Sequence, residues 1–227
     1  MIADPTKISP IPGFGEPVAA FSHLAAAGLF AALSWPLIRR GRGNSARVWS
    51  LGIYAFACVF QMAMSGVYHM LTPGSIGNQV LLRLDHAAIF FLIAATFTPI
   101  HVILFRGVLR WGKLTFIWGA AIAGIVLKTI FSAETPLWLG ALLYLGLGWM
   151  GIVTGGVLWK RHGFRFMSPL LYGGIAYSLG LVIEVAMAGN GVVQLIPGAF
   201  GGHEFFHFAV LVGMGLHWHF IYGFADG

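Results

Sequence analysis

Seven apolar runs take up most of the 227-residue chain, and each is about 20 residues long or slightly longer. A helix of about 20 residues crosses the ~30 Å hydrocarbon core of a bilayer and satisfies its backbone polar groups internally. We therefore predict an all-α integral membrane protein, a bundle of seven transmembrane helices. The predicted spans are 17–38, 47–71, 80–105, 112–132, 136–159, 168–189 and 203–224.

The composition supports a membrane location, because only 9% of the residues are charged whereas a soluble domain carries about 25%. Residues 1–16 are rich in proline and glycine and predict a short irregular tail, so the seven-helix domain comprises residues 17–227. Pro36 and Pro99 lie inside apolar runs, where proline kinks or ends a helix. An even number of spans would require one run to be re-entrant, and the fourth is the weakest candidate for spanning.

The net charge of +6 comes from basic residues at the ends of apolar runs, which indicates topology and argues against nucleic-acid binding. The clusters follow the first, third and fifth runs, so we expect these loops in the cytoplasm. The N-terminus then faces outside and the C-terminus faces the cytoplasm. The clusters are Arg39, Arg40, Arg42 and Arg47; Arg106, Arg110 and Lys113; and Lys160, Arg161 and Arg165.

Placing an ionisable side chain within a membrane span costs free energy, so such residues mark candidate functional positions. In the predicted topology many of them share one depth, near the outer face. His217 lies 14 residues after His203, about 21 Å along a helix at 1.5 Å per residue, and cannot join a site with it. The polar residues that share the outer depth are Glu16, His23, Ser65, His69, Asp85, His86, Glu184, His203, Glu204 and His207.

The spacing of His203 and His207 predicts a metal site, because imidazoles at i and i+4 lie on one helix face and can reach one ion. A catalytic zinc site takes three protein ligands and leaves one position for water. His69, at the same depth on another run, is the best third ligand. His86 is an alternative, but its side chain points about 100° away from that of Asp85 on a helix, so we expect it at most to support the site.

Asp85 and Ser65 are the candidate catalytic residues. Zinc lowers the pKa of bound water toward about 7 and polarises a carbonyl oxygen. Asp85 is placed to act as general base and then as general acid, and Ser65 lies four residues before His69, on the same helix face. We expect the Ser65 hydroxyl to hydrogen-bond the zinc-bound water or the developing oxyanion.

Three segments carry the candidate serine, aspartate and histidine residues: "SGVYH" (65–69), "RLDHAAIFFLIAATFTPI" (83–100) and "HEFFHFAVLVGMGLH" (203–217). Taken together, they resemble the haemolysin III branch of the progestin and adipoQ receptor family. That family belongs to a wider superfamily of seven-span zinc hydrolases that includes alkaline ceramidases. The first segment matches the S-x3-H of the family's second span, and the second segment is close to its third-span pattern. The third segment matches the H-x3-H of the seventh span and a further histidine downstream.

The resemblance implies that zinc is bound by His69, His203 and His207, with Ser65 and Asp85 as the other two core polar residues. It also implies hydrolysis of a lipid amide or ester, for example a ceramide-like substrate, in the cytoplasmic membrane of a bacterium. Membrane lipids are the expected partners, and the oligomeric state is left open. The alternative is a sensor or receptor of lipid or membrane state, in which a structural zinc links the second and seventh spans.

One segment departs from the family pattern. "EPVAAFSH" keeps the spacing of seven between Glu16 and His23 but has Ala19 where asparagine is usual, which weakens any role for Glu16 and His23. The role of Glu184 is also open, because a proton relay and an ion pair with Lys128 or Arg83 are both compatible with its position.

Overall fold

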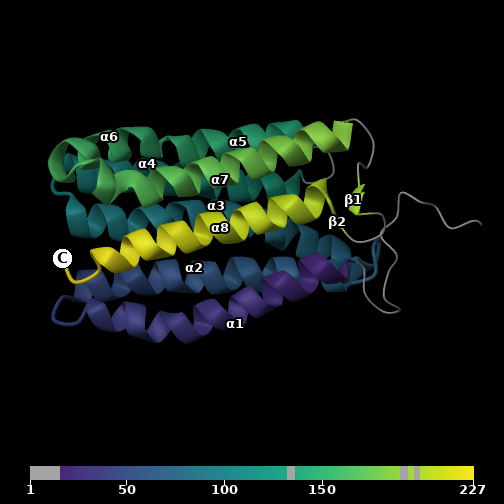
Figure 1. The fold of residues 1–227 in the computed structure, drawn as a ribbon, viewed down its shortest axis with the longest axis horizontal. Coiled ribbons are helices and arrows are strands. Elements are labelled where there is room, and N and C mark those ends of the chain that lie inside the picture. The colour runs from purple at the N-terminus through teal and green to yellow at the C-terminus, as the bar shows by residue number, and fades with distance from the viewer. Residues whose placement is uncertain (1–15, 132–135, 190–193, 197–199) are drawn as a thin grey trace, which may run out of the picture.

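The computed structural model describes residues 16–131, 136–189, 194–196 and 200–227. Its helices run side by side as a bundle, with the start of α1 at one end and the C-terminus at the other (Figure 1). We call the end where α1 starts the N-terminal end of the bundle. The helices are α1 (Pro17–Arg40), α2 (Ser45–Met70), α3 (Ile76–Leu104), α4 (Val108–Ile130), α5 (Leu137–Trp149), α6 (Gly151–His162), α7 (Phe164–Gly189) and α8 (Gly202–Gly223).

Seven of the described helical segments are long and apolar enough to cross a membrane, with α5 and α6 together forming the fifth. The fourth span, which was the weakest candidate in the sequence analysis, is a continuous helix of 23 residues. The prediction of an all-α protein with seven membrane spans is therefore confirmed. Two short antiparallel strands, β1 (Gln194–Ile196) and β2 (Phe200–Gly201), precede α8. The predicted tail, apart from Glu16, lies outside the described residues.

The start of α3 follows local capping chemistry rather than the limit of the apolar run. α3 begins earlier than predicted because the Ser75 hydroxyl accepts a hydrogen bond from the Asn78 backbone N–H, at 3.2 Å. Pro36 and Pro99 lie inside α1 and α3, and both helices continue beyond the proline. Neither proline therefore ends a helix.

The fifth span is interrupted, whereas the sequence predicted one continuous helix over 136–159. α5 ends at Trp149 and α6 begins at Gly151, with Met150 between them. The ammonium group of Lys113, on α4, donates a hydrogen bond to the Met150 carbonyl oxygen at 3.1 Å. Glycine is a poor helix former, and five glycines lie close to the break. These are Gly146, Gly148, Gly151, Gly155 and Gly156.

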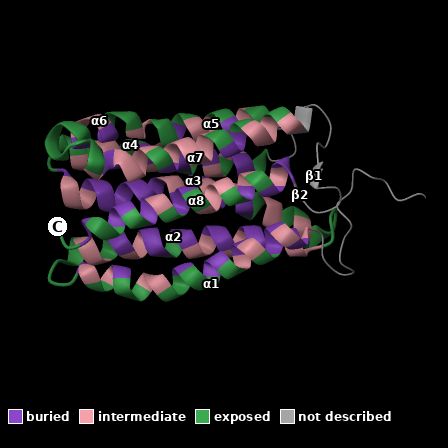
Figure 2. Ribbon diagram, in the orientation of Figure 1, coloured by how far each residue is buried: buried purple, intermediate pink, exposed green. Residues whose placement is uncertain are grey.

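The most buried spans are α2 and α3, which carry many of the buried residues in Figure 2. α1 packs along α2 and also contacts α8, and α8 packs along α7. Because neighbouring helices alternate in direction, the ends of α2 and α7 and the starts of α1 and α8 all lie at the N-terminal end of the bundle (Figure 1). The polar side chains at these helix ends can therefore meet.

Gly173, on α7, marks a close approach between helices. A Cβ atom at this position would overlap the ring of His217, on α8, and would lie 3.1 Å from the Gly213 carbonyl oxygen. We expect Gly173→Ala to lower the melting temperature in detergent, since overpacking costs about 1–3 kcal/mol. Gly174→Ala is the matched control, because a Cβ there would meet nothing within 4 Å. Equal melting temperatures for the two variants would contradict this account.

Candidate metal centre

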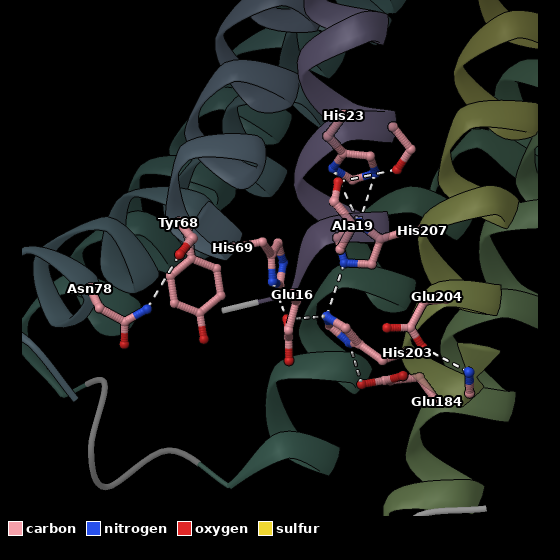
Figure 3. Close-up of polar contacts among 12 residues, drawn as sticks. Glu16, Ala19, His23, Tyr68, His69, Asn78, Glu184, His203, Glu204 and His207 are labelled. Carbon is pink, nitrogen blue, oxygen red and sulfur yellow. Dashed lines mark hydrogen bonds and ion pairs between the residues drawn. The ribbon is translucent and has the colours of Figure 1, made fainter. Parts of the chain in front are cut away.

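Three histidines converge at the N-terminal end of the bundle (Figure 3). His69 comes from the last turn of α2, and His203 and His207 come from the first two turns of α8. One ring nitrogen from each lies within 4.8 Å of those from the other two, and the ring centroids are 4.5 to 4.9 Å apart. His69 and His207 are buried, and His203 is half-buried. This group could hold a metal ion.

His203 is oriented by a carboxylate from α7. Its Nδ1–H donates a hydrogen bond to Glu184 Oε1 at 3.1 Å, and its Nε2 lies 3.0 Å from His207 Nε2. A proton fixed on Nδ1 leaves the lone pair of Nε2 free for a metal. Glu184 thus contacts a residue of the histidine group, and within the described chain neither Lys128 nor Arg83 forms an ion pair with it.

His207 is oriented by His23, a buried residue of α1. His207 Nδ1 lies 2.8 Å from His23 Nε2, and the two ring centroids are 4.1 Å apart. With Nδ1–H of His207 as the donor, its Nε2 lone pair also points toward the other two histidines. Both residues of α8 therefore present Nε2 to the centre of the group.

Glu16 lies immediately before α1 and contacts the group from the side of α2. Its backbone N–H donates to the His69 carbonyl oxygen at 2.9 Å, and its Oε2 contacts His69 Nδ1 and lies 3.5 Å from His203 Nε2. Burial opposes ionisation of this carboxyl, but the hydrogen bonds with His203 and His69 outweigh burial and hold its pKa well below the ordinary value.

The sequence interpretation gave little weight to Glu16 and His23 because Ala19 replaces the usual asparagine. The structure places both side chains against the histidine group (Figure 3). Their shared depth with His69 and His207 was the signal that could have identified them.

Asp85 and Ser65 lie in the same cavity as the histidines. Asp85, buried on α3, accepts a hydrogen bond from Gln61 Nε2 to Oδ1 at 3.0 Å, and Ser65 lies beside the same carboxylate. Sequence reasoning missed Gln61. Its signal was spacing, because Gln61, Ser65 and His69 follow one another at intervals of four residues and are all buried on one face of α2.

Three other polar residues that the sequence analysis named have different surroundings from the histidine group. His86 lines the cavity, and its Nδ1 is buried without a hydrogen-bond partner in the described part of the chain. His217 lies outside the histidine group, and its Nε2–H donates to the Leu170 carbonyl oxygen at 3.1 Å. Glu204 is buried and caps its own helix, because its carboxylate accepts a hydrogen bond from the Gly201 backbone N–H at 2.8 Å.

The fold and the site define a class of protein, a seven-span integral membrane protein whose three clustered histidines could hold a metal ion. The haemolysin-III related family model matches residues 14–218, and the chain belongs to this family.

Two curated relatives are similar over 143 residues. Hemolysin-3 of Bacillus cereus is 35% identical, with 62% of this chain and 63% of the relative covered. Hemolysin-3 homolog of Bacillus subtilis (strain 168) is 30% identical, with 63% of this chain and 66% of the relative covered. The matched part of the chain thus spans slightly less than two thirds of these relatives.

His23→Leu tests whether the partner of His207 Nδ1 matters for metal binding. Removing a partner on the far nitrogen of a ligating histidine weakens metal binding about 10- to 100-fold, and we expect a loss of this size in competition with a chromophoric chelator. Ser22→Ala is the control, because the Ser22 hydroxyl donates its hydrogen bond to the Ala19 carbonyl oxygen of its own helix, at 3.1 Å. An unchanged affinity in His23→Leu would show that His23 does not orient the ligand.

Proposed function

We propose that the protein is an integral-membrane zinc-dependent hydrolase of a lipid amide or ester, resembling a ceramidase in its chemistry. One observation carries this proposal: the three histidines, Asp85 and Ser65 all line one cavity of about 510 Å³ whose other walls are mainly apolar. A cleft with a few convergent polar groups in an apolar lining is the usual form of a site for an amphipathic ligand.

The donor set suits zinc. Three imidazoles without a thiolate favour zinc among the common metals, and three protein ligands are the usual number in catalytic zinc sites. When bound, zinc polarises a carbonyl oxygen and lowers the pKa of the water that it binds. We infer that His69, His203 and His207 would hold the ion.

The residues of the chain supply the proton transfers. Gln61 Nε2 bonds Oδ1 of Asp85, which holds the carboxylate in place beside the cavity. Asp85 then takes a proton from the attacking water and returns it to the leaving amine or alcohol. The Ser65 hydroxyl hydrogen-bonds the same carboxylate, and once Asp85 has taken up the proton of the water this hydroxyl would donate to the oxyanion that develops on the substrate carbonyl.

A lipid fits the shape of this cavity. It extends from the histidine group to His217, which lies 14 residues after His203 on α8, about 21 Å at 1.5 Å per residue. The cavity is lined along this length by apolar side chains. They include Leu82, Ile89, Leu92, Ile93, Ile100, Leu170, Leu171 and Val210. We infer that the acyl chain occupies this apolar part and that the amide or ester group lies beside the histidines.

The charge distribution supports a site that opens toward the outer leaflet. The three basic clusters lie at the ends of α1, α3 and α6 and at the starts of the helices that follow them, opposite the histidine group. With positive loops in the cytoplasm, the N-terminal end of the bundle faces outside. A bacterial cytoplasmic membrane is the location that we propose, with membrane lipids as the partners.

A sensor or receptor is the second candidate, and one observation favours it. The histidines belong to helices distant in sequence, α2 and α8, so an ion among them would tie these spans together. Turnover separates the two candidates, since a sensor would hold zinc without cleaving lipid.

Zinc content tests the metal site. We expect about one zinc per chain in purified protein by elemental analysis, and His207→Ala should lose it because one of three ligands is gone. His217→Ala is the control, because His217 lies on the same helix and lines the same cavity but stands outside the histidine group. Zinc that remains stoichiometric after replacement of all three histidines would refute the ligand assignment.

Asp85→Asn tests the proton-transfer role. In a mass-spectrometric screen of lipid amides and esters, we expect the variant to keep its zinc and to lose about 10²- to 10⁴-fold in turnover. Asp226→Asn is the control, because Asp226 is exposed at the other end of the bundle, 2.8 Å from Arg40. Zinc-loaded wild-type protein that cleaves no lipid across the screen would favour the sensor.

A further inference from the structure

The ring nitrogens of the α8 histidines face in two directions. Nδ1 of His203 and Nδ1 of His207 are turned away from the group and are engaged by Glu184 and His23. The two Nε2 atoms face each other at 3.0 Å and mark where an ion would bind. A partner that only orients a ligand should touch the outward nitrogen, as Glu184 does.

Glu16 differs from Glu184 in this respect. Its Oε2 lies 3.5 Å from Nε2 of His203, the inward nitrogen of that ring, and also contacts Nδ1 of His69. Ligand atoms of tetrahedral zinc, with bonds of about 2.0–2.1 Å, lie about 3.3 Å apart. The two Nε2 atoms are 3.0 Å apart, and Oε2 of Glu16 lies 3.5 Å from Nε2 of His203. One separation is slightly shorter than this value and the other is slightly longer.

We infer that Glu16 is a fourth protein ligand of the metal, binding through Oε2. This inference rests on the metal binding of the proposed function and adds a residue to it. A carboxylate oxygen is an ordinary zinc ligand beside imidazoles.

The backbone aims this carboxylate at the group. The Glu16 N–H bonds the carbonyl oxygen of His69, so the residue before α1 is attached to the last turn of α2. Pro17 follows as the first residue of the helix, where its fixed φ angle suits the helix start. The side chain therefore begins beside His69 and reaches across to His203 on α8.

Four protein ligands make a closed site, whereas hydrolysis needs a position for water. The Glu16 side chain remains 38% exposed, so its carboxylate can leave the group without passing through the core. Glu16 therefore acts as a gate: the site is closed while Oε2 is bound and opens when the carboxylate is displaced. An exogenous anion must compete with it in the wild-type protein.

The test uses full-length protein in detergent, stripped of metal and reloaded with Co²⁺, whose visible spectrum reports its ligands. Glu16→Gln keeps the size of the side chain but supplies a poor ligand, and water then takes the fourth position. We expect this variant to bind azide at least about tenfold more tightly than wild type, seen as a new absorption band, while its zinc affinity falls by about 100-fold or more. In Glu16→Ala, added acetate should restore the wild-type cobalt spectrum.

Glu184→Gln is the matched control, because Glu184 contacts the other nitrogen of the same histidine. It should lose zinc affinity but bind azide as wild type does. If Glu16→Gln binds azide no more tightly than wild type does, the inference is overturned and Glu16 is only an orienting residue. A zinc affinity of Glu16→Gln equal to that of wild type would also overturn it. Wild-type protein that binds neither Co²⁺ nor Zn²⁺ would instead refute the metal site of the proposed function, and this inference with it.

Discussion

Polar side chains at membrane depth must find partners within the protein, because hydrocarbon offers none. In this chain the requirement brings four helix ends together. His203 has Glu184 from α7 as its partner, His207 has His23 from α1, and His69 contacts the residue that precedes α1. Each bond fixes the direction of an imidazole ring. The convergence of the three histidines therefore depends on the contacts around them as much as on their own positions.

The sequence was sufficient for the architecture and for the histidine group. The thickness of the bilayer sets the length of a span, so run length alone predicted seven helices. The i, i+4 spacing put His203 and His207 on one helix face, and counting residues from the span ends put His69 at the same depth. Both arguments use only distances along helices, which the sequence specifies directly.

The partners of these residues could not be predicted, because they depend on how each helix is rotated about its axis. Spans that are apolar on every side give no periodic signal for that rotation. Depth alone therefore allowed Glu184 several partners, and it offered no reason to pair Gln61 with Asp85. The break at Met150 depends in part on tertiary structure, since the lysine bonded to its carbonyl oxygen lies on another helix, although the nearby glycines also weaken the helix.

We propose that histidines from α2 and α8 share one metal ion, and anomalous diffraction at the zinc edge tests this arrangement most directly. We predict a single strong peak about 2.0–2.1 Å from one ring nitrogen of each of His69, His203 and His207. A crystal of zinc-loaded protein with no anomalous peak among these rings, or with the rings turned apart, would contradict it.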